Sequence, residues 1–275
     1  MTTTSPAWTV AGASWRGTSH RKSATPCQDA FAWECADGAW VALAVADGAG
    51  SAPLADLGSK LAVQSAVAFA RAALTARPRL AGAAEDGDWR SLLSEAAGSA
   101  RSAVVDTARR LGRAPRALAS TLILVLAGPG RTAAIQIGDG ASVLESSEGE
   151  VRILTTPDTG EYMGETSFLT GEDALERARI AVVGEVRSIA LFSDGLQMQA
   201  LTYPKWEPYL AFFRPTFDFL RDHRDAGAAA KIEAFLSSDR LAARTDDDVT
   251  LLLAGRVPQV KLPPVPLSPL GELVV

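Results

Sequence analysis

The chain has 275 residues and a formal net charge of −5, with 47% hydrophobic and 21% charged residues. This composition is typical of a globular protein, and no apolar run approaches the roughly 18–20 residues that would span a bilayer. Lys and Arg are scattered rather than clustered, which argues against nucleic acid as a partner. No basic region followed by an apolar one marks the N-terminus as a secretion signal, so we expect a cytoplasmic protein without a membrane contact.

The predicted elements alternate between sheet and paired helices. Strands are expected at 7–13, 30–36, 39–46, 121–127, 131–137, 141–145, 151–154, 178–183, 188–193 and 249–255, and helices at 54–77, 89–111, 206–222 and 226–238. The turn Asp37-Gly38 would join the second and third strands. Residues 1–255 are expected to form one domain, and 256–275, with five prolines, an extended tail.

Three strands run directly into an aspartate followed by a glycine, at Asp47, Asp139 and Asp194. A hairpin turn is the ordinary explanation of Asp-Gly. It fits Asp139, which lies between two predicted strands, but a loop and a helix follow Asp47 and no strand pattern follows Asp194. We interpret Asp47 and Asp194 as carboxylates aimed into a site, with each glycine permitting close approach of a ligand or of backbone.

Three further aspartates, at 246–248, lead into the closing strand. Alone, such a charge run would be interpreted as a solvated turn. Carboxylates gathered at the ends of core strands would repel one another unless a cation held them, and Mg²⁺ and Mn²⁺ bind carboxylate, carbonyl and water oxygens. The two cysteines, Cys27 and Cys35, and the two histidines cannot build a usual zinc site. The sequence therefore predicts a site made of oxygen ligands.

Six segments match, in chain order, the motifs of one family: PCQDAF, VADGAGSAPLADLGSKLA, STLILVL, IGDGASVL, LFSDGL and DDVTLLL. On these motifs the chain resembles the metal-dependent Ser/Thr protein phosphatases of type 2C, the PPM family, in a bacterial form. The resemblance covers nearly the whole chain up to the tail. It implies an α+β fold of four layers, in which two central antiparallel β-sheets are flanked by helical pairs, with a metal site at one end of the sandwich.

The resemblance also implies a ligand set. Asp47 would bridge two Mn²⁺ or Mg²⁺ ions, the carbonyl of Gly48 would ligate one of them, and Asp194 and Asp247 would hold the other. Two ions ~3.5–4 Å apart can activate a bridging hydroxide and stabilise a phosphoryl group during in-line displacement, without a protein nucleophile. The implied activity is hydrolysis of phosphoserine and phosphothreonine in proteins, opposing a bacterial Ser/Thr kinase.

Two aspartates have supporting places in this resemblance. Asp29 would lie behind the metal ligands and orient metal-bound water, and Asp139, with Asp194, matches the position of a weaker third metal. Residues 155–173 lie where the family has a flap beside the active site. A loop of that length in a compact domain is usually functional or disordered, and we interpret it as a substrate-facing flap that contributes no metal ligand.

The chain departs from the family at its phosphate-binding arginine, whose position is Ala24. Either Arg21 or Lys22 takes over, with Arg21 the better candidate because a guanidinium binds phosphate in a bidentate way, or phosphate binding is weaker. Position 28 is Gln28, so an amide replaces the carboxylate ligand of some members.

The histidine that many eukaryotic members place after Asp-Gly, as a general acid, is Ala49 here, and His20 is the one nearby candidate for such a role and, with Arg21, for binding phosphate. A lone histidine is more often structural than catalytic. These departures leave two alternatives open: a catalytically impaired phosphatase-like binding protein, and a two-metal hydrolase of small phosphate esters. Retention of Asp47, Gly48, Asp194 and Asp247 favours the enzyme.

Overall fold

The computed structural model describes residues 8–36, 39–77, 80, 85–157, 166–223 and 227–257. The predicted turn at Asp37-Gly38, most of the predicted tail and the middle of the predicted flap lie outside these residues. In the described part of the chain, no helix combines the length and apolar character needed to cross a membrane.

Two five-stranded antiparallel sheets form the centre of the fold, in the orders β1-β12-β9-β6-β7 and β2-β3-β4-β5-β8. The first sheet contains β1 (Trp8–Trp15), β6 (Ala141–Ser146), β7 (Val151–Thr155), β9 (Val186–Phe192) and β12 (Val249–Arg256). The second contains β2 (Ala30–Ala36), β3 (Trp40–Ala46), β4 (Leu122–Gly128), β5 (Arg131–Ile137) and β8 (Arg179–Val183). A two-stranded ribbon is made by β10 (Leu201–Thr202) and β11 (Glu207–Pro208).

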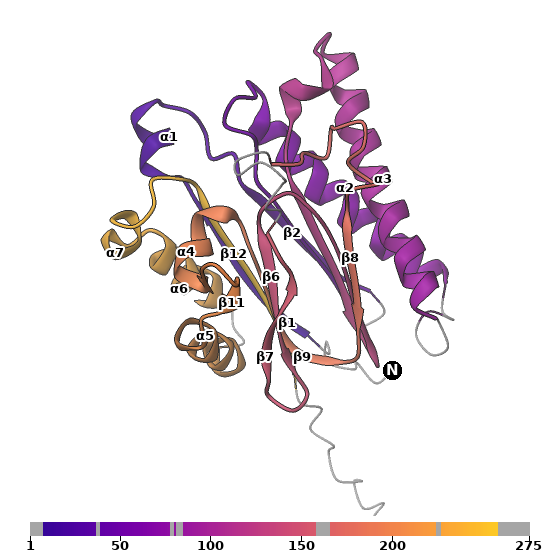
Figure 1. Ribbon diagram of the computed structural model, residues 1–275, viewed down its shortest axis with the longest axis vertical. Coiled ribbons are helices and arrows are strands. Elements are labelled where there is room, and N and C mark those ends of the chain that lie inside the picture. Colours follow the sequence, from indigo (N-terminus) through magenta and orange to yellow (C-terminus); the bar gives the residue numbers. More distant parts are fainter. Residues whose placement is uncertain are drawn as a thin grey trace, which may run out of the picture.

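Helices cover the outer face of each sheet, so the fold has four layers (Figure 1). The long helices α2 (Ala55–Ala76) and α3 (Asp86–Arg110) pack on the second sheet, and α5 (Leu210–Asp222) and α6 (Gly227–Leu236) pack on the first. Shorter helices in the described part are α1 (Thr18–Lys22), α4 (Gln197–Ala200) and α7 (Asp239–Ala242), and 3₁₀ turns include η2 (Pro115–Leu118) and η3 (Asp194–Leu196). The α+β sandwich expected from the sequence is confirmed.

Apolar side chains fill the three spaces between the four layers. All seven residues of β3 are buried, because this strand packs on the other sheet through one face and on α2 and α3 through the other. Trp40 of β3 stacks on Trp89 of α3, with ring centroids 4.8 Å apart. On the far side of the sandwich, Phe192 and Phe213 join β9 to α5.

The hairpin expected at Asp139-Gly140 is wrong. β5 belongs to the second sheet and β6 to the first, so this connection crosses between sheets rather than joining neighbours. The amide of Gln136 holds the crossing by donating to the carbonyls of Gly138 (3.0 Å), Gly140 (2.7 Å) and Thr156 (2.9 Å). Gly138, at φ +104, adopts a backbone conformation that favours glycine.

The expected elements otherwise occur close to their predicted bounds. α5 begins at Leu210 rather than at 206, because Glu207–Pro208 pairs with Leu201–Thr202 as β11. β12 continues to Arg256, one residue beyond the domain end predicted at 255. The division into a domain of 1–255 and a tail of 256–275 stays a prediction, because residues 258–275 are outside the described part.

Candidate metal centre

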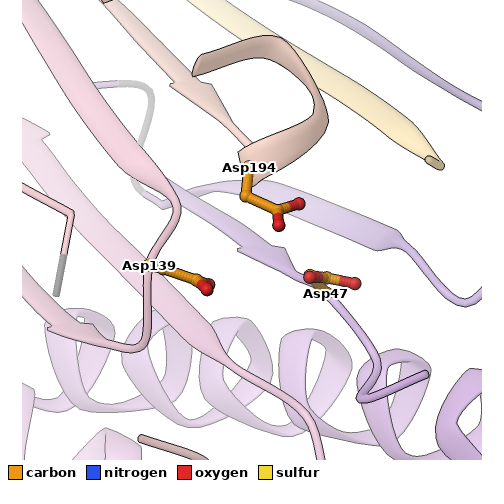
Figure 2. A group of neighbouring side chains, drawn as sticks. All are labelled: Asp47, Asp139 and Asp194. Atoms are coloured by element: carbon orange, nitrogen blue, oxygen red, sulfur yellow. The ribbon is translucent and has the colours of Figure 1, made fainter. Parts of the chain in front are cut away.

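Three of the predicted aspartates meet at one end of the sandwich. Asp47 follows β3, Asp139 lies in the crossing from β5 to β6, and Asp194 opens η3 directly after β9. One carboxylate oxygen from each lies within 4.8 Å of those from the other two. Figure 2 shows the three side chains pointing toward a common space. Both sheets therefore contribute to a single acidic cluster.

The glycines after these aspartates allow neighbouring backbone to come close. A Cβ on Gly48 would lie 2.8 Å from the Cβ of Ala55 at the start of α2, and one on Gly195 would lie 2.2 Å from the carbonyl oxygen of Asp248. A side chain at either position would push apart elements that hold the cluster together. The close approach expected from the sequence is thus an approach of backbone, which brings α2 toward Asp47 and the start of β12 toward Asp194.

Burial and mutual repulsion raise the pKa values of the clustered carboxyls. The pKa of Asp47 lies well above its ordinary value, first because of burial and then because of the charges of Asp29 and Asp194. Burial, with the charges of Asp139 and Asp247, raises the pKa of Asp194 to about 8. Without a cation the cluster therefore retains protons near neutral pH, and a bound cation would favour the ionised forms.

The donor atoms present fit a hard divalent cation. Asp139 Oδ1, Asp194 Oδ1 and the amide oxygen of Gln28 are buried without a hydrogen-bond partner among the described residues. Each is an oxygen of the type that Mg²⁺ and Mn²⁺ bind. Buried polar atoms are ordinarily paired, so these three are suited to a ligand that the protein itself does not supply.

A cavity of about 200 Å³ surrounds the cluster. Its lining comprises His20, Gln28, Asp47, Gly48, Ala49, Gly50, Asp139, Thr166, Phe168, Asp194 and Asp247. Asp247 thus faces the same cavity without joining the group of three. Thr166 and Phe168, from the described end of the predicted flap, form part of the wall, and the Thr166 hydroxyl donates to Asp139 Oδ2 at 2.6 Å. Residues 158–165 of the flap are not described.

Asp29 lies behind the cluster. Its side chain is 4% exposed and does not line the cavity. The Ser193 hydroxyl donates to Asp29 Oδ2 at 2.6 Å and itself accepts from the Thr250 amide at 2.9 Å. Burial raises the pKa of Asp29 to about 6, against the lowering effect of the Ser193 hydrogen bond. Asp29 is therefore placed to support Asp47 rather than to contact a substrate.

The three consecutive aspartates have three different environments. Asp246 is exposed and uses its backbone carbonyl, which accepts from the amide (2.9 Å) and hydroxyl (2.7 Å) of Ser19. Asp247 faces the cavity. Asp248 is 2% exposed, and its carboxylate accepts from the backbone amides of Gly17 (2.7 Å) and Gln28 (2.6 Å). Sequence reasoning did not distinguish Asp248, whose partners lie more than 200 residues away in the chain.

Asp248 also pairs with His20, whose Nδ1 lies 2.9 Å from Asp248 Oδ2. His20 lines the cavity beside Asp248, but its Nδ1 forms no hydrogen bond within the described part of the chain. Arg21, the stronger sequence candidate for binding phosphate, is exposed and lines a separate small hollow beside Trp15 and Asp247. The structure places His20 in the cavity and leaves Arg21 out of its lining.

Comparison with known proteins agrees with this geometry. A family model described as protein phosphatase 2C matches residues 16–237. The serine/threonine-protein phosphatase 3 of Escherichia coli (strain K12) is 33% identical over 256 residues, covering 90% of this chain and 98% of that protein. The chain therefore belongs to the protein phosphatase 2C family, and the sequence prediction of a phosphoprotein phosphatase is confirmed.

Solved structures share the fold at lower identity. The serine/threonine phosphatase of S. agalactiae superposes with a TM-score of 0.63 at 12% identity, covering 91% of this chain and 100% of that one. The catalytic domain of the phosphatase PstP, solved with two manganese ions, has a TM-score of 0.55 at 21% identity, covering 91% of this chain and 98% of that one. These similarities concern the fold.

Proposed function

We propose that this protein hydrolyses phosphoserine and phosphothreonine in protein substrates, using two Mn²⁺ or Mg²⁺ ions held at the acidic cluster. The observation that carries the proposal is the convergence of Asp47, Asp139 and Asp194 around buried, unpartnered oxygens in a cavity open to a ligand. The E. coli relative is named as a serine/threonine-protein phosphatase, which supports the same substrate class here.

The proposed ligand set is the one that the family resemblance implies. Asp47 shares the cluster with Asp139 and Asp194, and we assign it to both ions. Gly48 and Asp247 line the same cavity, and the carbonyl of Gly48 and the carboxylate of Asp247 would complete the set. Asp139 would hold a third, weaker site, as the resemblance implies. Divalent cations at such a site supply Lewis acidity toward phosphoryl oxygens and make water nucleophilic near neutral pH.

The side chains around the cavity favour attack by water rather than by the protein. Among the described residues, the single hydroxyl side chain in the lining is that of Thr166, which donates to Asp139. Cys27 does not line the cavity, and burial raises the pKa of its thiol, which keeps it protonated. Within the described lining, no hydroxyl or thiol is thus available as an activated nucleophile, and the carboxylates are assigned to the metals.

The remaining residues of the site hold its side chains in position and exclude water from the substrate. Asp248 holds Gln28 and His20 against the cavity, where the imidazole can donate to a phosphate oxygen. Phe168 forms an apolar part of the wall, where it limits water around the substrate. Asp29, bonded to Ser193, supports Asp47 from behind. A bacterial Ser/Thr kinase that phosphorylates the same protein would be the opposing enzyme.

A phosphothreonine peptide with Mn²⁺ tests the proposal. The wild-type protein should release phosphate, and chelation should abolish the release. Asp47→Asn should lower kcat/KM by about 100-fold or more, since a metal contribution of several kcal/mol is at stake, whereas Asp246→Ala, which leaves the cavity intact, should keep it. Free nucleotides should be poor substrates. Release that persists without metal, or an Asp47→Asn enzyme of full activity, would show the assignment to be wrong.

A further inference from the structure

A groove runs between α5 and α6, against the outer face of the first sheet. It consists of two hollows with volumes of about 300 and 340 Å³. Ala211, Phe212 and Phe235 line both. The ring centroids of Phe212 and Phe235 lie 6.1 Å apart, and this ring pair stands where the hollows meet.

Small side chains explain why the first hollow is not filled. α5 contributes Ala211, Pro215 and Thr216 to its wall, and none of these reaches far toward α6. The buried residues Leu251 and Leu253 of β12 also line it, so the hollow extends down to the sheet. Protein interiors seldom leave voids much larger than a water molecule, whereas small-molecule sites are apolar hollows of roughly this size with a few polar groups.

The polar groups of the groove are cationic. Lys231 lines the first hollow, and Arg240 and Arg244 line the second. None of the three forms an ion pair within the described part of the chain. The described lining of the two hollows includes no carboxylate. An apolar cavity with unpaired cations at its rim is complementary to a molecule that combines an apolar body with a negative charge.

We propose that this groove binds a small amphipathic anion: an apolar chain or ring that carries one carboxylate. The apolar body occupies the hollow above Leu251 and Leu253, and the carboxylate meets the cations of the rim. The groove shares no lining residue with the cavity of the acidic cluster. The ligand is therefore distinct from the phosphorylated substrate.

The position of the second hollow gives this ligand a regulatory role. Gln199 of α4 and Leu241 of α7 line it. α4 follows η3, which begins at Asp194, and α7 ends five residues before Asp247. A bound molecule thus contacts the elements on which two cavity aspartates depend. The regulatory role rests on the proposed function, whereas binding of the anion does not.

Binding of decanoate to the metal-free full-length chain tests the proposal without reference to catalysis. Titration calorimetry below the micelle concentration should give saturable binding of one molecule, and the decyltrimethylammonium cation should bind at least about tenfold more weakly. Ala211→Trp places an indole where the hollows meet and should raise the Kd about tenfold or more. The matched control is Ala234→Trp, at an exposed position of α6 that lines neither hollow, and it should leave the Kd unchanged.

Charge-reversal substitutions at the surface test the same proposal without altering the packing of the core. Lys231→Glu, or the double change Arg240→Glu with Arg244→Glu, should raise the Kd about tenfold or more. The proposal is overturned if decanoate does not bind saturably, if the cation binds equally well, or if neither reversal matters. It is also overturned if decanoate binds only after residues 258–275 are removed, which would make the tail the occupant, or if anionic phosphatidylglycerol vesicles bind and free decanoate does not.

Discussion

Replacing Asp248 by alanine should destabilise the metal-free protein even though this residue does not line the cavity. Its carboxylate is 2% exposed and accepts from the amides of Gly17 at 2.7 Å and Gln28 at 2.6 Å. Leaving two buried amide donors unpaired costs about 1–3 kcal/mol each. Removing the buried carboxylate charge offsets part of this cost. We expect the free energy of unfolding to fall by about 2–5 kcal/mol.

Urea unfolding in the presence of a chelator, followed by tryptophan fluorescence, measures this change. Asp246→Ala is the matched control because its side chain is exposed and only its backbone carbonyl is bonded; it should shift the free energy by less than about 0.5 kcal/mol. Asp247→Ala should lower metal-free stability less than Asp248→Ala, because it removes one hydrogen bond, from the Asp248 amide at 2.8 Å, and also removes a carboxylate from a repulsive group. Equal effects of Asp246→Ala and Asp248→Ala would refute the distinction between the three aspartates.

Three further outcomes are expected. Because folding raises the pKa of Asp29 to about 6 and of Asp194 to about 8 from an ordinary 3.8, the folded metal-free protein binds more protons than the unfolded chain. Its stability should therefore fall as pH rises from about 4 through 8, and a flat profile of unfolding free energy against pH would contradict this. Millimolar Mn²⁺ should raise the Tm in a concentration-dependent way, and Asp194→Asn should weaken that dependence. A Tm that does not change with the Mn²⁺ concentration would argue against a metal site. Finally, His20→Ala should raise KM for a phosphopeptide about tenfold while Arg21→Ala leaves it unchanged, and the reverse result would restore Arg21 as the phosphate-binding residue.

The sequence predicted the strands and long helices well because their signals are local. Apolar runs and helical spacing mark β3, β9 and α2 without reference to the rest of the chain. The connection at Asp139 shows the limit of this approach. Gly128–Gly130 and Asp139-Gly140 both lie between two strands, yet the first is a hairpin, with Gly128 paired to Arg131, and the second crosses between sheets. A strand-turn-strand pattern does not specify which strands pair.

For the candidate site too, the sequence indicates residues with a local signal and not those that depend on distant partners. Asp47 and Asp194 stand at strand ends followed by glycine and by no hairpin partner, and that local signal marked them as candidates for a site. Asp139, whose Asp-Gly fitted a hairpin turn, entered the predicted site through the family resemblance, and the structure brings the three together. Asp248 and the Thr166 contact to Asp139 depend on partners far away in the sequence, so no local pattern could assign them. The placing of His20 in the cavity instead of Arg21 depends on the Asp248 contact, which only the fold creates.

The claim that the acidic cluster is a metal centre can be tested directly by anomalous scattering from a crystal grown with Mn²⁺. We predict two anomalous peaks in the cavity beside Asp47, about 3.5–4 Å apart, with Asp194 and Asp247 on one of them. A cavity without an anomalous peak at saturating Mn²⁺, or peaks bound only at other carboxylates of the surface, would contradict the account.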